Sequence, residues 1–238
     1  MLSQKKSFAV KIFSTIIILL VGISFLQKSI DLQRKFEDLE ANLLLMPGEI
    51  AGSLILSGFR GIGADLLWLQ VHHCWHSGQH YRMLPLFNSI TFLQPHFITP
   101  WAIGGWHMAY NIYVLMKTEK EKNYWLQTGL NFLRRGTEHN PNRYDLYFEL
   151  AWTYYHKAKD YANAVKYFEK AVKFPHPEYV DDCLAHAYAK NGQIKKSIKT
   201  WEDIIRNNSG FKEVAIRILR NLKTYGTENP PEKKEQKK

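Results

Sequence analysis

Histidines crowd one short stretch of the chain and could bind a metal ion. His72, His73, His76 and His80 surround Cys74, and on a helix His72 and His76 would share a face one turn apart. Zinc or haem could use that spacing. A metalloprotease helix also needs a glutamate beside the first histidine, and covalent haem attachment needs Cys-x-x-Cys-His, but the stretch contains neither pattern. We therefore predict packed or groove-lining histidines and no bound metal or cofactor, with a metal or haem site at His72 and His76 as the alternative.

Catalytic motifs are absent from the rest of the sequence. It contains no glycine-rich phosphate loop, no nucleophile elbow and no paired-carboxylate motif. Cys74 and Cys183 are too few for a disulfide framework, so we predict two free, buried thiols. The sequence predicts a protein that is not an enzyme.

Length and composition favour one extended helical domain with an anchor. The chain has 238 residues, of which 45% are hydrophobic, and a formal net charge of +10. A basic protein can bind nucleic acid, but no arginine-rich block appears in the middle of the chain. We therefore do not expect nucleic acid as a partner.

The elements that must position these residues come from a sequence that repeats itself. Small and aromatic residues recur 33 positions apart (188 − 155, 197 − 164, 201 − 168). The pairs are Tyr155 with Tyr188, Ala164 with Ser197, and Phe168 with Trp201. Such a period is typical of stacked helix-turn-helix units. The pattern resembles the tetratricopeptide repeat (TPR) family, which implies an all-α solenoid whose first helices line a concave, partner-binding face.

Weaker copies of the pattern extend the predicted repeat domain to residues 64–225, with about four helical hairpins. The first hairpin turns at Ser77–Gly78–Gln79, and the second has either an extended first helix or an inserted loop at residues 116–123. Residues 211–225 are apolar on one face only, as a capping helix must be. Residues 226–238 are proline-containing and charged, and we predict a disordered tail.

Residues 1–28 have the pattern of a membrane anchor. Lys5, Lys6 and Lys11 precede a run without charge over residues 12–26. A basic start and an apolar run are typical of a signal anchor and of a cleavable signal peptide. No small-residue cleavage site follows, so we predict an uncleaved, single transmembrane helix with its N-terminus in the cytoplasm. The resemblance to prokaryotic TPR proteins implies the bacterial inner membrane, with the repeat domain on the periplasmic side.

Residues 29–63 would connect the anchor to the repeats as a stalk and a membrane-proximal helix. An apolar stripe over residues 30–46 fits a partner helix or the protein's own first repeat equally well. Residues 49–63 are rich in small residues and would pack against the first repeat or rest on the membrane surface.

The resemblance also places particular side chains on the concave face, which is aromatic in its N-terminal half and charged in its C-terminal half. They are Trp68, His72, Trp75, His76, Trp106, Tyr110, Thr153, His156, Lys157, His186 and Lys190. We predict a membrane-anchored scaffold that binds a protein or peptide partner in this groove and supports assembly of a membrane-associated complex. Two alternatives stay open: residues 49–63 fill the groove, or the protein is a purely structural subunit of a membrane complex.

Overall fold

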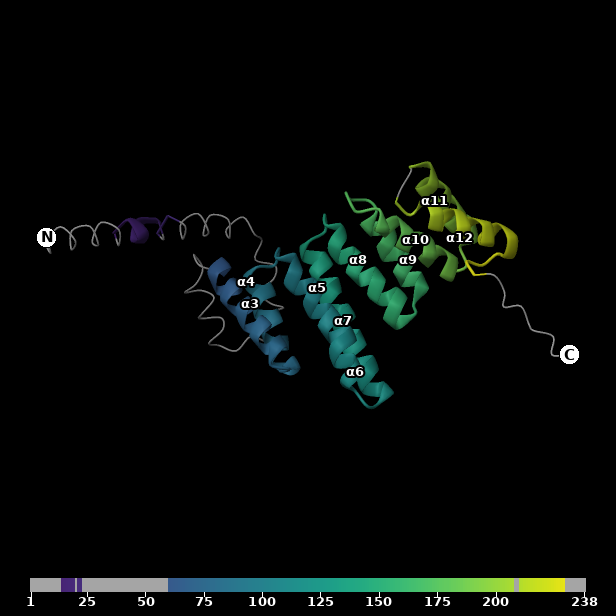
Figure 1. Cartoon of the computed structure of the whole chain (residues 1–238). Coiled ribbons are helices and arrows are strands. Elements are labelled where there is room, and N and C mark those ends of the chain that lie inside the picture. Colours follow the sequence, from purple (N-terminus) through teal and green to yellow (C-terminus); the bar gives the residue numbers. More distant parts are fainter. Residues whose placement is uncertain (1–13, 20, 23–59, 208–209, 230–238) are drawn as a thin grey trace. The chain divides into compact units, whose positions relative to one another are not determined.

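The computed structural model describes residues 14–19, 21–22, 60–207 and 210–229. Within these ranges all regular structure is helical (Figure 1), as predicted. None of the described helices is both long and apolar enough to cross a bilayer. The predicted stalk, most of the predicted anchor, residues 49–59 of the predicted membrane-proximal segment and residues 230–238 of the predicted tail lie outside the described residues. Residues 60–63, which were assigned to the membrane-proximal segment, form the start of the first described long helix.

The chain divides into two compact units, which are described separately. Unit 1 contains the described residues up to Gly78 together with Pro85–Gln94, and unit 2 contains Gln79–Leu84 and everything from Pro95 onward.

Unit 1 contains a helical hairpin. Helix α3 (Arg60–His76) ends at a turn in which Gly78 has a φ of 66°, a conformation that glycine adopts without strain. The chain returns in α4 (Met83–Leu93), where Phe87 is fully buried and its ring lies 6.4 Å from that of Trp68. The predicted turn at Gly78 is confirmed.

Unit 2 begins with the short helix η2 (His80–Arg82), followed by a hairpin with two long helical arms. The first arm is continuous, and a π-helical stretch lies within it. Its segments are α5 (Ile98–Trp106), η3 (His107–Ile112) and α6 (Tyr113–Leu115). The second arm is α7 (Glu119–His139). The first arm ends at Leu115 and the second begins at Glu119, so only residues 116–118 connect them. Neither alternative for residues 116–123 is correct, because most of that segment forms the start of the second helix.

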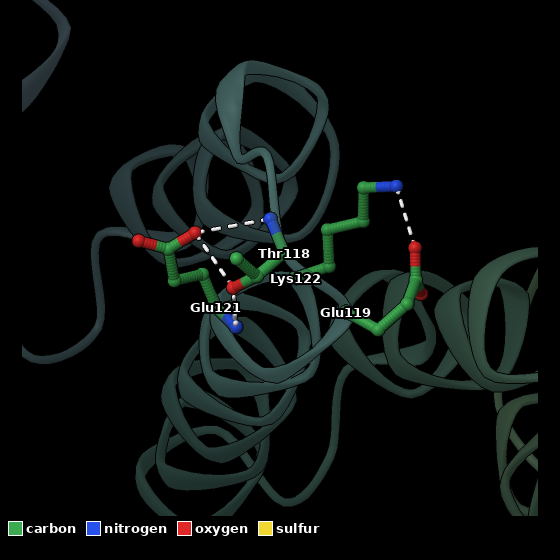
Figure 2. Close-up of polar contacts among 4 residues, drawn as sticks. All are labelled: Thr118, Glu119, Glu121 and Lys122. Carbon is green, nitrogen blue, oxygen red and sulfur yellow. Dashed lines mark hydrogen bonds and ion pairs between the residues drawn. The ribbon is translucent and has the colours of Figure 1, made fainter.

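Helix α7 begins at Glu119, within the segment 116–123, because Thr118 and Glu121 cap its N-terminus (Figure 2). The Thr118 hydroxyl accepts the Glu121 N–H at 3.2 Å, and the Glu121 carboxylate accepts the Thr118 N–H at 3.1 Å. This reciprocal arrangement satisfies backbone donors that a helix start leaves without partners. The hydrogen bonds from Thr118 also lower the pKa of Glu121. An ion pair of 2.7 Å between Lys122 and Glu119 lies beside the cap.

Glycines allow α5 and α7 to approach closely. A Cβ atom on Gly129 would lie 2.7 Å from the carbonyl oxygen of Gly105 and 3.0 Å from the Cβ of Ala109. A Cβ atom on Gly136 would meet the Trp101 side chain at 3.0 Å. The backbones of the two arms are therefore nearly in contact, and the buried Trp101 lies against α7.

Two further hairpins follow in chain order along unit 2 (Figure 1), each in contact with the next. The second consists of α8 (Tyr144–Thr153), the π-helical η4 (Tyr154–Ala158) and α9 (Tyr161–Ala171). The third consists of α10 (Tyr179–Lys190) and α11 (Ile194–Arg206).

Residues that lie 33 positions apart have the same role in these two hairpins. Ala164 and Ser197 are both fully buried, and so are Phe168 and Trp201. The Ser197 hydroxyl donates to the carbonyl of Ala185 at 2.9 Å, which satisfies a polar group in the core. Residues separated by the 33-residue period therefore occupy equivalent packing positions in the two hairpins.

Helix α12 (Lys212–Tyr225) covers the last hairpin. Its buried residues Ala215, Ile218 and Leu222 form one apolar cluster with Trp201 and Ile204 of α11. The opposite side of α12 is exposed. This arrangement confirms the predicted capping helix.

The close approach of α5 and α7 predicts that Gly129→Ala is destabilising. Because the new methyl group would meet backbone atoms, the helices must move apart, and we expect a loss of about 1–3 kcal/mol in unfolding free energy. Gly61→Ala is the control, because the nearest atom to its Cβ would be Gln94 Nε2 at 3.5 Å. It should be neutral or stabilising. Thermal unfolding of both variants tests this, and equal melting temperatures would contradict the close approach.

The cap predicts a second difference in stability. Leu222 is 2% exposed whereas Ile216, on the same helix, is 42% exposed. Leu222→Ala should therefore cost about 2–5 kcal/mol and Ile216→Ala less than about 1 kcal/mol. Because repeats depend on their neighbours, amide exchange should accelerate first in α11 and α10 of the Leu222 variant. Similar exchange in the two variants would show that α12 is not the cap.

Candidate functional site

Two π-helical segments lie in the first helices of adjacent hairpins of unit 2. Tyr110 belongs to η3, and His156 and Lys157 belong to η4. A π-helical turn contains an extra residue, and such turns are frequent at functional sites. Three of the residues predicted for the groove therefore lie where the first helices depart from regular α-helical geometry.

Side chains from these helices form a stack of four rings, Trp106, Tyr110, His156 and Trp152. The centroids of Trp106 and Tyr110 are 6.3 Å apart, those of Tyr110 and His156 are 5.9 Å apart, and those of His156 and Trp152 are 5.5 Å apart. The His156 ring is nearly parallel to both neighbours, at 8° to Tyr110 and 2° to Trp152. We call these four residues the ring stack. It crosses from the first hairpin of unit 2 to the second.

Lys157 adds a positive charge to the ring stack. Its ammonium nitrogen lies 4.8 Å from the centroid of Tyr110 and 4.5 Å from that of Tyr113, which is cation–π geometry. Burial and the nearby Lys159 lower the pKa of Lys157. At one end of the ring stack, next to Tyr110, Trp106 keeps 38% of its surface exposed. The ring stack thus presents an apolar surface with a cation along one side.

Thr153 differs from the prediction that it contacts a partner. Its side chain is 1% exposed, and its hydroxyl donates to the carbonyl of Glu149 at 2.8 Å. Thr153 lies on the predicted helix, but its short side chain is buried and bonds to the backbone of its own helix, so it does not reach the surface. Burial also raises the pKa of Glu149.

A pocket of about 890 Å³ lies farther along unit 2. It is lined by α10, α12, residues of the second hairpin and residues 228–229. Its lining includes Trp152, Tyr155, Asp182, Cys183, His186, Lys190, Val214, Arg217, Ile218, Asn221, Glu228 and Asn229. Trp152 belongs to both the ring stack and the pocket, so the two features meet at this residue.

His186 lies between two carboxylates of the pocket. Its Nδ1 is 2.7 Å from Glu228 Oε1, and its Nε2 is 3.6 Å from Asp182 Oδ1. Its ring packs nearly perpendicular to that of Trp201, at 81° with centroids 5.0 Å apart. Burial alone would lower the pKa of His186, but the hydrogen bond and charge of Glu228, together with the charge of Asp182, raise it above the usual value. The ring is therefore a cationic donor over a wider pH range than an isolated histidine.

Both cysteines are free, as predicted. Cys74 is buried, whereas Cys183 is only partly buried at the pocket. Burial and the charge of Asp182 raise the pKa of the Cys183 thiol to about 12, so it stays protonated at neutral pH.

The N-terminal members of the predicted set lie on α3 in unit 1. Nε2 of His76 lies 3.3 Å from Nε2 of His72, and Trp75 is 38% exposed. In the part of the chain that the structure describes, no three histidine, cysteine or acidic side chains are arranged to hold a metal ion. The structure therefore brings Trp106, Tyr110, His156, Lys157, His186 and Lys190 onto one unit, and Trp68, His72, Trp75 and His76 onto the other.

The sequence analysis missed most of the pocket lining, including four residues that matter for its chemistry. Trp152 could have been found, because it precedes His156 by one helical turn and must share its face. Tyr155 was assigned only a packing role in the repeat. Arg217 and Glu228 carried no signal, because the cap and the segment after it have no place in the repeat pattern.

One comparison with known proteins matches a segment of unit 2. Residues 144–174 match the family model described as tetratricopeptide repeat. This segment is similar to a tetratricopeptide repeat. It contains α8, η4 and α9, so Trp152, His156 and Lys157 lie on the first helix of the matched segment.

A search of the curated proteins returned no match. Among solved structures, the chain is similar to the crystal structure of a thermophilic TPR protein from Thermus thermophilus. The identity is 13% and the TM-score 0.49, over 65% of this chain and 78% of that one.

The ring stack predicts the titration of His156. Burial and the charges of Lys159 and Lys157 lower its pKa, so the value from ring-proton NMR should fall below 6.5. As the pH falls through about 6.5, His156 then becomes protonated in the unfolded chain before it does so in the folded protein. Acidification therefore lowers the free energy of unfolding. Tyr110→Ala uncovers one face of the imidazole and should bring the pKa back toward 6.5. Tyr113→Ala, which removes a ring not stacked on His156, should change it little, and an equal shift in both variants would contradict the stacking.

Proposed function

We propose that the protein is a membrane-anchored scaffold that holds a protein or peptide partner on the surface formed by the ring stack and the pocket. The observation that carries this proposal is the continuity of the two features through Trp152, which yields an aromatic surface leading into a charged pocket. Interfaces that bind peptides tightly commonly combine aromatic anchors with polar neighbours.

The ring stack can supply most of the affinity. Large flat side chains bury much area at a small cost in conformational entropy, and their neighbours here already hold them in place. A partner residue that covers Trp106 would remove its exposed surface from water. Lys157 and the pocket cations would orient acidic groups of the partner, mainly through the association rate.

The membrane part of the proposal rests on the sequence of residues 1–28. The basic residues before the apolar run favour a cytoplasmic N-terminus, which would put the TPR-containing units on the periplasmic side of a bacterial inner membrane. A scaffold of this kind needs no catalytic group. Its role would be to keep one component of a membrane-associated complex close to the others.

Site-specific photo-crosslinking on carbonate-washed membranes tests the proposal. A photoreactive phenylalanine at position 106 should give a defined adduct with the partner. The same residue at position 124, where Tyr124 of α7 is 62% exposed, is the matched control and should give none. Equal yields at the two positions would contradict a partner on the ring stack, and release of the protein by the wash would contradict the anchor.

Once the adduct identifies the partner, its affinity can be measured for variants that remain folded. Trp106→Ala should weaken binding by about 30- to 1,000-fold, because truncating a buried aromatic anchor typically costs about 2–4 kcal/mol. Lys157→Ala should cost less than about 1 kcal/mol, and its effect should fade as salt rises. Unchanged binding by the Trp106 variant would exclude the ring stack as the site.

A further inference from the structure

We propose that the pocket beside His186 binds an acidic side chain of the partner, and that Glu228 of this chain occupies that position until the partner displaces it. This inference rests on the proposed function. It adds that the partner segment is acidic and that Glu228 competes with it for the pocket.

Glu228 is held in the pocket like a ligand. It follows the last helix, yet its side chain is only 12% exposed and makes the 2.7 Å hydrogen bond with His186. Its backbone carbonyl accepts the Asn221 side-chain amide at 2.7 Å. Gly226, with a φ of 69°, turns the chain back at the end of α12, and its N–H bonds to the carbonyl of Leu222 at 3.0 Å. We call residues 226–229 the strap; the sequence had assigned them to the charged tail.

The charges around the strap are left partly unbalanced. Lys190 of α10 and Arg217 of α12 line the pocket, and neither forms an ion pair within residues 60–207 and 210–229. Asp182 is the other carboxylate near His186. A segment with two acidic residues could place one carboxylate on His186 and the second near the free cations, which the single carboxylate of Glu228 does not satisfy. Charge complementarity therefore favours an acidic peptide over the strap itself.

The rest of the pocket can accept the neighbours of such a residue. Trp152, Tyr155 and Ile218 give it apolar walls. Burial raises the pKa of Tyr155 to about 12, so its phenol stays neutral and adds no repulsion toward an acidic ligand. The volume of about 890 Å³ is in the range of peptide and small-molecule sites. The expected ligand is an acidic residue flanked by apolar or aromatic ones.

The strap should compete strongly because it belongs to the same chain. A tethered ligand on a short connection acts at an effective concentration on the order of millimolar. A partner that makes the same contact must overcome that concentration, so releasing the strap should raise the apparent affinity of an added acidic peptide by about ten-fold or more.

The test uses the full-length chain and a fluorescein-labelled peptide with the sequence of residues 224–229, Thr-Tyr-Gly-Thr-Glu-Asn. Binding is followed by fluorescence anisotropy. Glu228→Gln should bind the peptide about ten-fold or more tightly than the wild type. Glu213→Gln, an exposed carboxylate on α12 outside the pocket, is the matched control and should behave as the wild type.

Two further measurements identify the contact. A peptide with glutamine in place of its glutamate should bind Glu228→Gln no more tightly than it binds the wild type. Adding His186→Phe to Glu228→Gln should likewise abolish the tighter binding of the glutamate peptide, and the phenylalanine ring can still contact Trp201. Should the double variant unfold, the glutamine peptide tests the same contact from the ligand side.

Equal affinity of the wild type and Glu228→Gln for the peptide, including no binding to either, would overturn the inference. Equal binding of the glutamate and glutamine peptides would do the same. If the adduct at position 106 forms nonetheless, only the strap inference fails; if that adduct is also missing, the proposed function fails with it.

Discussion

The parallel contact between Tyr110 and His156 is the interaction on which the candidate surface depends. In a repeat array each unit buries its apolar face only against its neighbours, so contacts between adjacent units decide whether their faces form one surface. Here a ring from η3 and a ring from η4 lie 5.9 Å apart at an angle of 8°, and the Lys157 ammonium lies over the same tyrosine. Without that contact, Trp106 and the pocket would belong to separate surfaces.

The other end of unit 2 shows the same coupling between packing and function. Helix α12 closes the apolar cluster around Trp201, the indole ring of Trp201 packs nearly perpendicular to the His186 ring, and His186 holds Glu228. Arg217 on the same capping helix lines the pocket. A helix that the array requires for stability therefore also forms one wall of the candidate site.

The periodicity of the sequence predicted the repeat hairpins and their core positions. Features that depend on contacts between helices could not be predicted from it. Ala164 and Ser197, or Phe168 and Trp201, could be paired by their spacing because equivalent core positions demand similar sizes. The π-helical turns at Tyr110 and His156 left no sequence pattern, since they depend on how neighbouring helices pack. Thr153 was placed on the right helix but at the wrong depth, because its hydroxyl bonds to the Glu149 carbonyl. Glu228 lies beyond the last periodic residue. Gly226 is a local signal that a helix ends, but no local rule indicated that the next residues enter the pocket. The anchor at residues 1–28 stays a prediction.

A double-mutant cycle on Tyr110→Leu and His156→Leu tests the central claim most directly. Unfolding free energies of the wild type, both single variants and the double variant give the coupling between the two rings. If their contact joins the two hairpins, the coupling should be about 0.5–1.5 kcal/mol, the range found for stacked aromatic pairs. Strictly additive effects would contradict the account, because they would mean that the two rings lie side by side without holding the surface together.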